Sequence, residues 1–124
     1  MKEIQPERIF NLHPKIRWAG LASDGGDLLF SKMRPNVESI SPQATDESFM
    51  ELGPMLLSGV CERLASCAGP LDNVVSTYEK VALIVKRLGN RYLAITINRS
   101  DESVLPEIIE KLQELAAEWP KPLL

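Results

Sequence analysis

The sequence predicts an α+β fold, in which a five-stranded antiparallel sheet carries helices on both faces. Two hairpins and one broad helical stripe support this prediction. Residues 81–97 are two runs of strand-forming residues about Gly89-Asn90, and residues 15–33 repeat that pattern about Gly25-Gly26. Residues 46–67 space their apolar side chains with a helical period. The length suits a single domain over residues 1–124.

The chain begins with a short predicted helix over residues 6–12, because Pro6 suits a first helical turn and Pro14 ends the helix. A strand follows over residues 15–22. Its alternation places one set of side chains on a common face: Ile16, Trp18, Gly20 and Ala22. The turn at residues 23–26 leads into a second strand over residues 27–33. Residues 34–44 include two prolines and predict a loop.

Residues 46–67 predict the longest helix, with Thr45 or Asp46 as its N-cap. Its apolar residues form two neighbouring stripes, which together are wider than one sheet face requires. The first stripe contains Phe49, Leu52, Leu56, Val60, Arg63, Leu64 and Cys67, and the second contains Met50, Gly53, Leu57, Cys61 and Ala65. Pro54 predicts either a kink or a helix start after an irregular first turn. Cys61 and Cys67 lie about 240° apart around the axis, so we expect two buried, reduced thiols.

The second half of the chain supplies three strands and a helix. Gly69-Pro70 ends the long helix, and residues 71–78 are polar enough for an edge strand. In the central hairpin, residues 81–85 are apolar without interruption, and Leu93, Ile95 and Ile97 share one face of the second strand. Residues 98–102 predict a polar loop. A last helix over residues 103–118 presents an apolar face: Leu105, Ile108, Leu112, Leu115 and Trp119. The order is α-β-β-α-β-β-β-α, with short connections that favour antiparallel neighbours.

Composition argues against several classes of function. The chain has 124 residues, 44% hydrophobic and 25% charged, with a net charge of −3. A mildly acidic chain does not suit nucleic-acid binding, which relies on basic contacts to phosphate. No apolar run approaches the ~18 residues of a membrane span. The N-terminal residues lack the apolar core of a secretory signal, so we expect a cytoplasmic protein.

Residues that could carry chemistry are scarce. His13 is the only histidine, so catalytic triads and zinc sites lack partners, and we expect it to act as a cap or surface contact. Residues 24–27, DGGD, lack the ligand spacing of an EF-hand and suit a hairpin turn. Neither a dinucleotide-binding nor a P-loop motif is present. We therefore expect no catalytic residues, no cofactor and no metal.

Two groups of residues keep a binding role open. Trp18 and Trp119 suit the core, but Trp18 could instead line a ligand pocket on the sheet face. Basic residues near the strand ends fit a solvated rim better than an anion site, although a partner surface is an alternative. They are Arg17, Lys32, Arg34, Lys86, Arg87 and Arg91.

The element order, the SDGG hairpin and the segments YEKVALIV and GNRYLAITI resemble the Roadblock (dynein light chain) and longin-like superfamily, of profilin-like topology. The segments IFNLHPKIRWAGL, KMRP and YEKVALIVKRLGNRYL are similar to a small archaeal Roadblock-like family. The resemblance covers nearly the whole chain, from Ile9 to Leu115. It implies a non-enzymatic module that forms homo- or heterodimers through its long helix and third strand. It also implies a platform for Ras-like small GTPases or for signalling and trafficking assemblies.

The residues agree with this implication in one respect: a surplus apolar helix stripe and a polar edge strand both need a partner. The predicted dimer or partner interface is Met50, Gly53, Leu57, Cys61, Asn73 and Val75. The alternative for Met50, Leu57 and Cys61 is that they face the core. Pro54 departs from the helix that the resemblance implies. The alternative function is a small-molecule sensor, which would use its sheet face as PAS or GAF domains do.

Overall fold

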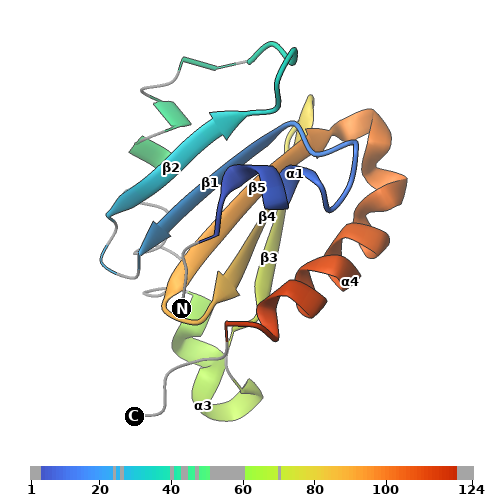
Figure 1. Cartoon of the computed structure of the whole chain (residues 1–124). Helices are drawn as coiled ribbons and strands as arrows, with labels where there is room; N and C mark the ends of the chain where they lie inside the picture. Colours follow the sequence, from blue (N-terminus) through green and yellow to red (C-terminus); the bar gives the residue numbers. More distant parts are fainter. Residues whose placement is uncertain are drawn as a thin grey trace.

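The sheet is antiparallel and five-stranded, with strand order β2-β1-β5-β4-β3 (Figure 1). A computed structural model of the chain describes residues 4–23, 25, 27–39, 41–42, 45–46, 48–50, 61–69 and 71–119. The strands are β1 (Trp18–Ser23), β2 (Leu28–Met33), β3 (Asn73–Thr77), β4 (Val81–Leu88) and β5 (Arg91–Asn98). The pairings β1–β2 and β4–β5 confirm both predicted hairpins, and β1–β5 joins them. β3 lies at an edge, as its polar sequence predicts.

Five helical segments with defined bounds lie within the described residues. They are α1 (Pro6–Phe10), η1 (Cys61–Leu64), α3 (Ala65–Ala68), η2 (Arg99–Val104) and α4 (Leu105–Ala116). The first and last predicted helices are therefore confirmed. Residues 48–50 are also helical, while residues 51–60, which include the predicted Pro54 kink, lie outside the described residues.

Two apolar clusters cover opposite faces of the sheet. On one face α1 and α4 pack against the sheet, with Ile9, Ile95 and Ile108 fully buried. On the other face Met50 packs with Trp18, Leu83 and Val85. β4 and β5 alternate between the two clusters, as their sequence predicts. The uninterrupted apolar run of β4 is therefore explained by cover on both faces.

Glycine supplies the conformation at the central turn. Gly89 has φ = 60° between β4 and β5, in the left-handed region that a side chain disfavours. Gly69 has φ = 89° after α3, and its N–H donates to the Ala65 carbonyl at 2.9 Å. Gly89 lies where the sequence predicts a turn, and Gly69 lies where it predicts the end of a helix.

Local turns overturn two expectations. The Ile16 N–H donates to the His13 carbonyl at 3.3 Å, so the alternation of β1 begins only at Trp18. Ile16 consequently lies in the cluster beneath α1 and α4, rather than beside Trp18. Residues 99–104 form η2 instead of a polar loop. Asp101 and Glu102 occupy its first turn, where negative charge is favourable, and η2 runs directly into α4.

The packing of side chains overturns two further expectations from the sequence. Lys86 does not belong to a solvated rim: it is only 1% exposed, because strand periodicity places it under α4 with Ile84 and Leu88. Cys67 is an exposed free thiol, so the expected burial of both cysteines is wrong for this residue. Leu64, from the same predicted stripe, is 68% exposed. The C-terminal end of the predicted long helix therefore does not cover the sheet.

Candidate functional site

The outer edge of β3 carries main-chain groups that β4 does not use. The Tyr78 N–H donates to the Val81 carbonyl at 2.8 Å, and the Arg87 N–H donates to the Asp72 carbonyl at 3.3 Å. In an antiparallel pair, hydrogen-bonded and non-hydrogen-bonded positions alternate. Even-numbered positions from 72 to 78 therefore bond to β4. The N–H and C=O groups of Asn73, Val75 and Thr77 point away from β4, toward the edge of the sheet beyond which no further described strand lies.

Apolar side chains accompany this edge on both faces. Val75 is 40% exposed and pairs with Ile84, which places it on the α4 side of the sheet. Tyr78 is 55% exposed and lines the opposite face beside Leu83. Backbone that pairs with no other described strand, beside exposed apolar side chains, is the arrangement that sheet edges otherwise avoid. Val75, Tyr78 and the outward groups of β3 are called the β3 edge below.

The predicted interface residues do not all come together. Asn73 and Val75 lie on the β3 edge. Met50 takes the core role, because it is 1% exposed and packs with Trp18 on the sheet. Gly53 and Leu57 lie outside the described residues, as does the side chain of Cys61, although its backbone begins η1.

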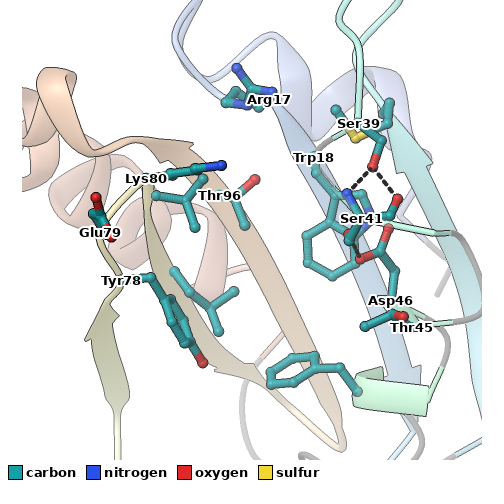
Figure 2. A pocket seen from close by; sticks show the side chains of 14 residues that line it. Arg17, Trp18, Ser39, Ser41, Thr45, Asp46, Tyr78, Glu79, Lys80 and Thr96 are labelled. Atoms are coloured by element: carbon teal, nitrogen blue, oxygen red, sulfur yellow. Dashed lines mark hydrogen bonds between the residues drawn. The ribbon is translucent and has the colours of Figure 1, made fainter.

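A groove opens on the sheet face opposite α4 (Figure 2). Its volume is about 560 Å³, and Trp18, Phe49 and Tyr78 are its aromatic residues. Leu83 of β4 and Thr96 of β5 also line the groove, and they pair with each other in the sheet. The indole N–H of Trp18 donates to the Ser31 hydroxyl at 3.0 Å, which fixes the plane of the ring. The groove agrees with the alternative role of Trp18, as part of a pocket on the sheet face.

Charged groups around the groove are divided between its two sides. The Arg17 guanidinium donates to Asn98 Oδ1 and to the Glu38 carbonyl, both at 2.8 Å. Lys80 lines the same cavity at the start of β4. On the other wall, Asp46 Oδ1 accepts from the Ser41 hydroxyl at 2.6 Å. Figure 2 shows the arginine and the lysine toward one end, with Asp46 on the wall beyond Trp18.

Sequence interpretation overlooked Tyr78 and Lys80. Ser76 pairs with Leu83, so period-two alternation along β3 places Tyr78 on the same face as Ser76. That signal was present in the sequence. The contribution of Lys80 depends instead on the turn between β3 and β4, whose direction no periodicity reveals.

Two other polar residues hold the fold together. Arg34 donates to the carbonyls of Phe10, His13 and Ile16, which fastens the end of β2 to the segment before β1. His13 Nδ1 accepts from the Lys15 main-chain N–H at 3.1 Å, which agrees with the predicted capping role. The residue is only 9% exposed and its Nε2 lies 2.8 Å from Glu107 Oε2 of α4, so it is not a surface contact.

The remaining site classes leave no trace in the part of the chain that the structure describes. Within it, no three His, Cys, Asp or Glu side chains gather closely enough to hold a metal ion. The described helices include none with the length and apolarity to cross a membrane.

Comparison with known proteins identifies the fold. No protein-family model and no curated protein matches the chain. A solved structure of MglB with a tetrameric arrangement has a TM-score of 0.69 and 16% identity, over 96% of this chain and 90% of that one. A Roadblock/LC7 domain from Streptomyces avermitilis has a TM-score of 0.65 and 17% identity, over 90% and 88%. The gliding protein MglB from Thermus thermophilus has a TM-score of 0.60 and 17% identity, over 90% and 85%.

These likenesses extend over nearly the full length of the chain and agree with its strand order and its helices on both sheet faces. The narrower resemblance, to a small archaeal family, stays a prediction. At these identities the comparisons establish architecture rather than activity. The chain therefore has the Roadblock fold, an α+β arrangement of helices about a five-stranded antiparallel sheet.

Proposed function

We propose that this chain is a cytoplasmic, non-enzymatic, single-domain interaction module that forms a homodimer through the β3 edge. The observation that carries the proposal is the outward main chain of Asn73, Val75 and Thr77, flanked by exposed Val75 and Tyr78. An extended strand from another chain can add to such an edge through main-chain hydrogen bonds. The same strand of a second copy is the simplest partner, because a two-fold axis makes the patch self-complementary.

The geometry favours pairing near the centre of β3. Val75 is the middle residue of the strand, so an antiparallel pair centred on it would use every outward group from Asn73 to Thr77. Each added hydrogen bond contributes about 1 kcal/mol net, and burial of Val75 and Tyr78 adds an apolar contribution. One structure with this fold is described as having a tetrameric arrangement, which supports association for that protein.

A further partner follows from the Roadblock resemblance rather than from a site on this chain. The resemblance implies that many Roadblock-type domains serve as platforms for Ras-like small GTPases or for signalling and trafficking assemblies. We propose a role of this kind, with the dimer as the platform. This proposed platform role would be supported if the wild-type protein copurified a GTPase from native lysate and a monomeric variant did not.

Replacing Val75 by lysine should convert the dimer to a folded monomer. The new charge would lie at the centre of the proposed strand pair, and lysine is a residue that natural sheet edges use against pairing. Leu29→Lys is the matched control, because Leu29 is 41% exposed on β2, the opposite edge of the sheet. Light scattering at micromolar concentration should give a dimer mass for the wild type and Leu29→Lys, and a monomer mass for Val75→Lys.

Two single proline substitutions, at neighbouring positions of β3, distinguish a loss of dimerisation from a loss of folding. The Val75 N–H points away from β4, so Val75→Pro should abolish dimerisation while circular dichroism remains close to wild type. The Ser76 N–H belongs to the β4 ladder, so Ser76→Pro should destabilise the monomer itself. A monomeric wild type, or a Val75→Lys protein that still dimerises, would rule out this interface.

A further inference from the structure

We propose that the groove beside Trp18 binds a small amphipathic carboxylate, a molecule with an apolar body and one anionic end. This proposal is separate from dimerisation, because the groove lies on the sheet face opposite α4 and, among the residues named for the β3 edge, shares only Tyr78 with it. The groove measures about 560 Å³, within the range of roughly 300–1,000 Å³ typical of small-molecule sites. Three aromatic side chains surround an aliphatic floor, with a few polar groups at the margin.

The apolar part of the ligand would lie between Trp18 and Tyr78. Trp18 is held by its hydrogen bond to Ser31, and Leu83 and Val81 of β4 are buried core residues beneath the cavity. Phe49 also lines the groove and packs against the cluster that contains Val85 and Tyr92, which lie farther along the strands from Lys80. Rigid aromatic walls over a sheet lose little side-chain entropy when a ligand binds, which favours an apolar occupant.

Both basic residues of the groove lie at one end. The Arg17 N–H donates to the Thr96 carbonyl at 2.8 Å, and its guanidinium donates to Asn98. Val81, the residue after Lys80, pairs with Asn98 in the sheet. Arg17 and Lys80 are therefore brought together around the end of β5. Among the described residues Lys80 has no ion-pair partner, and Figure 2 shows its amine extending toward the cavity beside Thr96.

The acidic groups around the groove set the direction of the ligand. Asp46 lies on the wall beyond Trp18 and accepts from Ser41, so it would repel an anion from that side. Glu79 also lines the groove, but Figure 2 shows its carboxylate turned away from Arg17. Positive charge is thus concentrated where the chain of β5 leaves the sheet. A carboxylate would bind there, with its apolar body directed toward Phe49.

Decanoate, used below its micelle-forming concentration, is a suitable probe. In a Trp119→Phe background Trp18 is the only tryptophan, so its fluorescence reports on the groove. We expect decanoate to change the Trp18 emission and to raise the melting temperature. Lys80→Gln should weaken decanoate binding about fivefold, as expected for one charge-assisted contact at an exposed position. Lys15→Gln is the matched control, because Lys15 does not line the groove, and it should leave binding unchanged.

Two comparisons identify which part of the ligand is recognised. Tyr78→Ala should weaken decanoate and decanol equally, whereas Lys80→Gln should affect only decanoate. Light scattering of Tyr78→Ala in parallel separates a loss of binding from a change in association. Equal affinity for decanoate and decanol with no effect of Lys80→Gln, or no response of Trp18 to decanoate, would overturn the proposal. Vesicles of anionic phospholipid that bind the protein in place of monomeric decanoate would also overturn it. None of these three results would bear on main-chain pairing at the β3 edge.

Discussion

Replacing Gly20 by alanine is expected to destabilise the fold by about 2 kcal/mol, the usual range for adding a methyl group to a filled core. Gly20 is buried in β1, between Ser31 of β2 and Ala94 of β5. A Cβ atom there would lie 2.7 Å from Cη2 of the Trp18 ring and 2.8 Å from Sδ of Met50. Carbon atoms normally pack about 3.5–4.0 Å apart. Glycine is therefore required because a side chain crosses closely over the strand.

The same substitution should move the wall of the groove. With Trp119→Phe in the background, Gly20→Ala should shift the Trp18 emission to longer wavelength, because the displaced indole meets more water. Gly25→Ala is the matched control, since its Cβ would meet only the Ser23 hydroxyl at 3.8 Å. Adding Trp18→Phe to Gly20→Ala should recover part of the lost stability, because the smaller ring clears the methyl group. Unchanged stability and emission in Gly20→Ala would contradict this packing.

Removing the carboxylate of Asp72 should cost about 2 kcal/mol, because it leaves the buried Lys86 cation without its counter-charge. The cost is less than for a fully buried pair, because the Asp72 side chain is 58% exposed. Lys86 lies under α4, and its ammonium pairs with Asp72. Asp72 also accepts from the side-chain amide of Gln113 on α4, and its main-chain carbonyl accepts from Arg87. The carboxylate thus joins α4, β4 and the segment before β3. We expect Asp72→Ala to lower the free energy of unfolding in urea, measured at one protein concentration.

Controls for this prediction distinguish a pair with one buried charge from a pair whose two charges are both exposed. The double variant Asp72→Ala/Lys86→Met removes both charges and should lie within about 1 kcal/mol of the wild type, since apolar replacements of buried ion pairs are often neutral. Lys32→Ala breaks an exposed pair with Glu7, 3.8 Å apart, and should change stability by less than about 1 kcal/mol. If Asp72→Ala were as mild as Lys32→Ala, the burial of the Lys86 charge would be refuted.

The elements that the sequence patterns predicted correctly are those that depend on residues close together in the chain. Gly89-Asn90 marks the central turn because the backbone there needs a positive φ. The alternation of Leu93, Ile95 and Ile97 places them in one cluster, and the stripe of Ile108, Leu112 and Leu115 directs α4 onto the same face. Each of these patterns depends on residues two to four positions apart. The edge position of β3 also follows from its own polar composition.

The features that the sequence patterns could not predict depend on contacts between elements that are far apart in the chain. Met50 has an apolar side chain that suits either core or interface, and its contact with β1, some thirty positions earlier, settles the matter. Lys86 is charged, yet α4 covers it and Asp72 neutralises it. The groove lies between two distant parts of the chain, since Ser39, Asp46 and Phe49 line it together with residues at the start of β4 and the end of β5. Periodicity assigns a side chain to a face, whereas burial and cavities arise from how separate elements pack across that face.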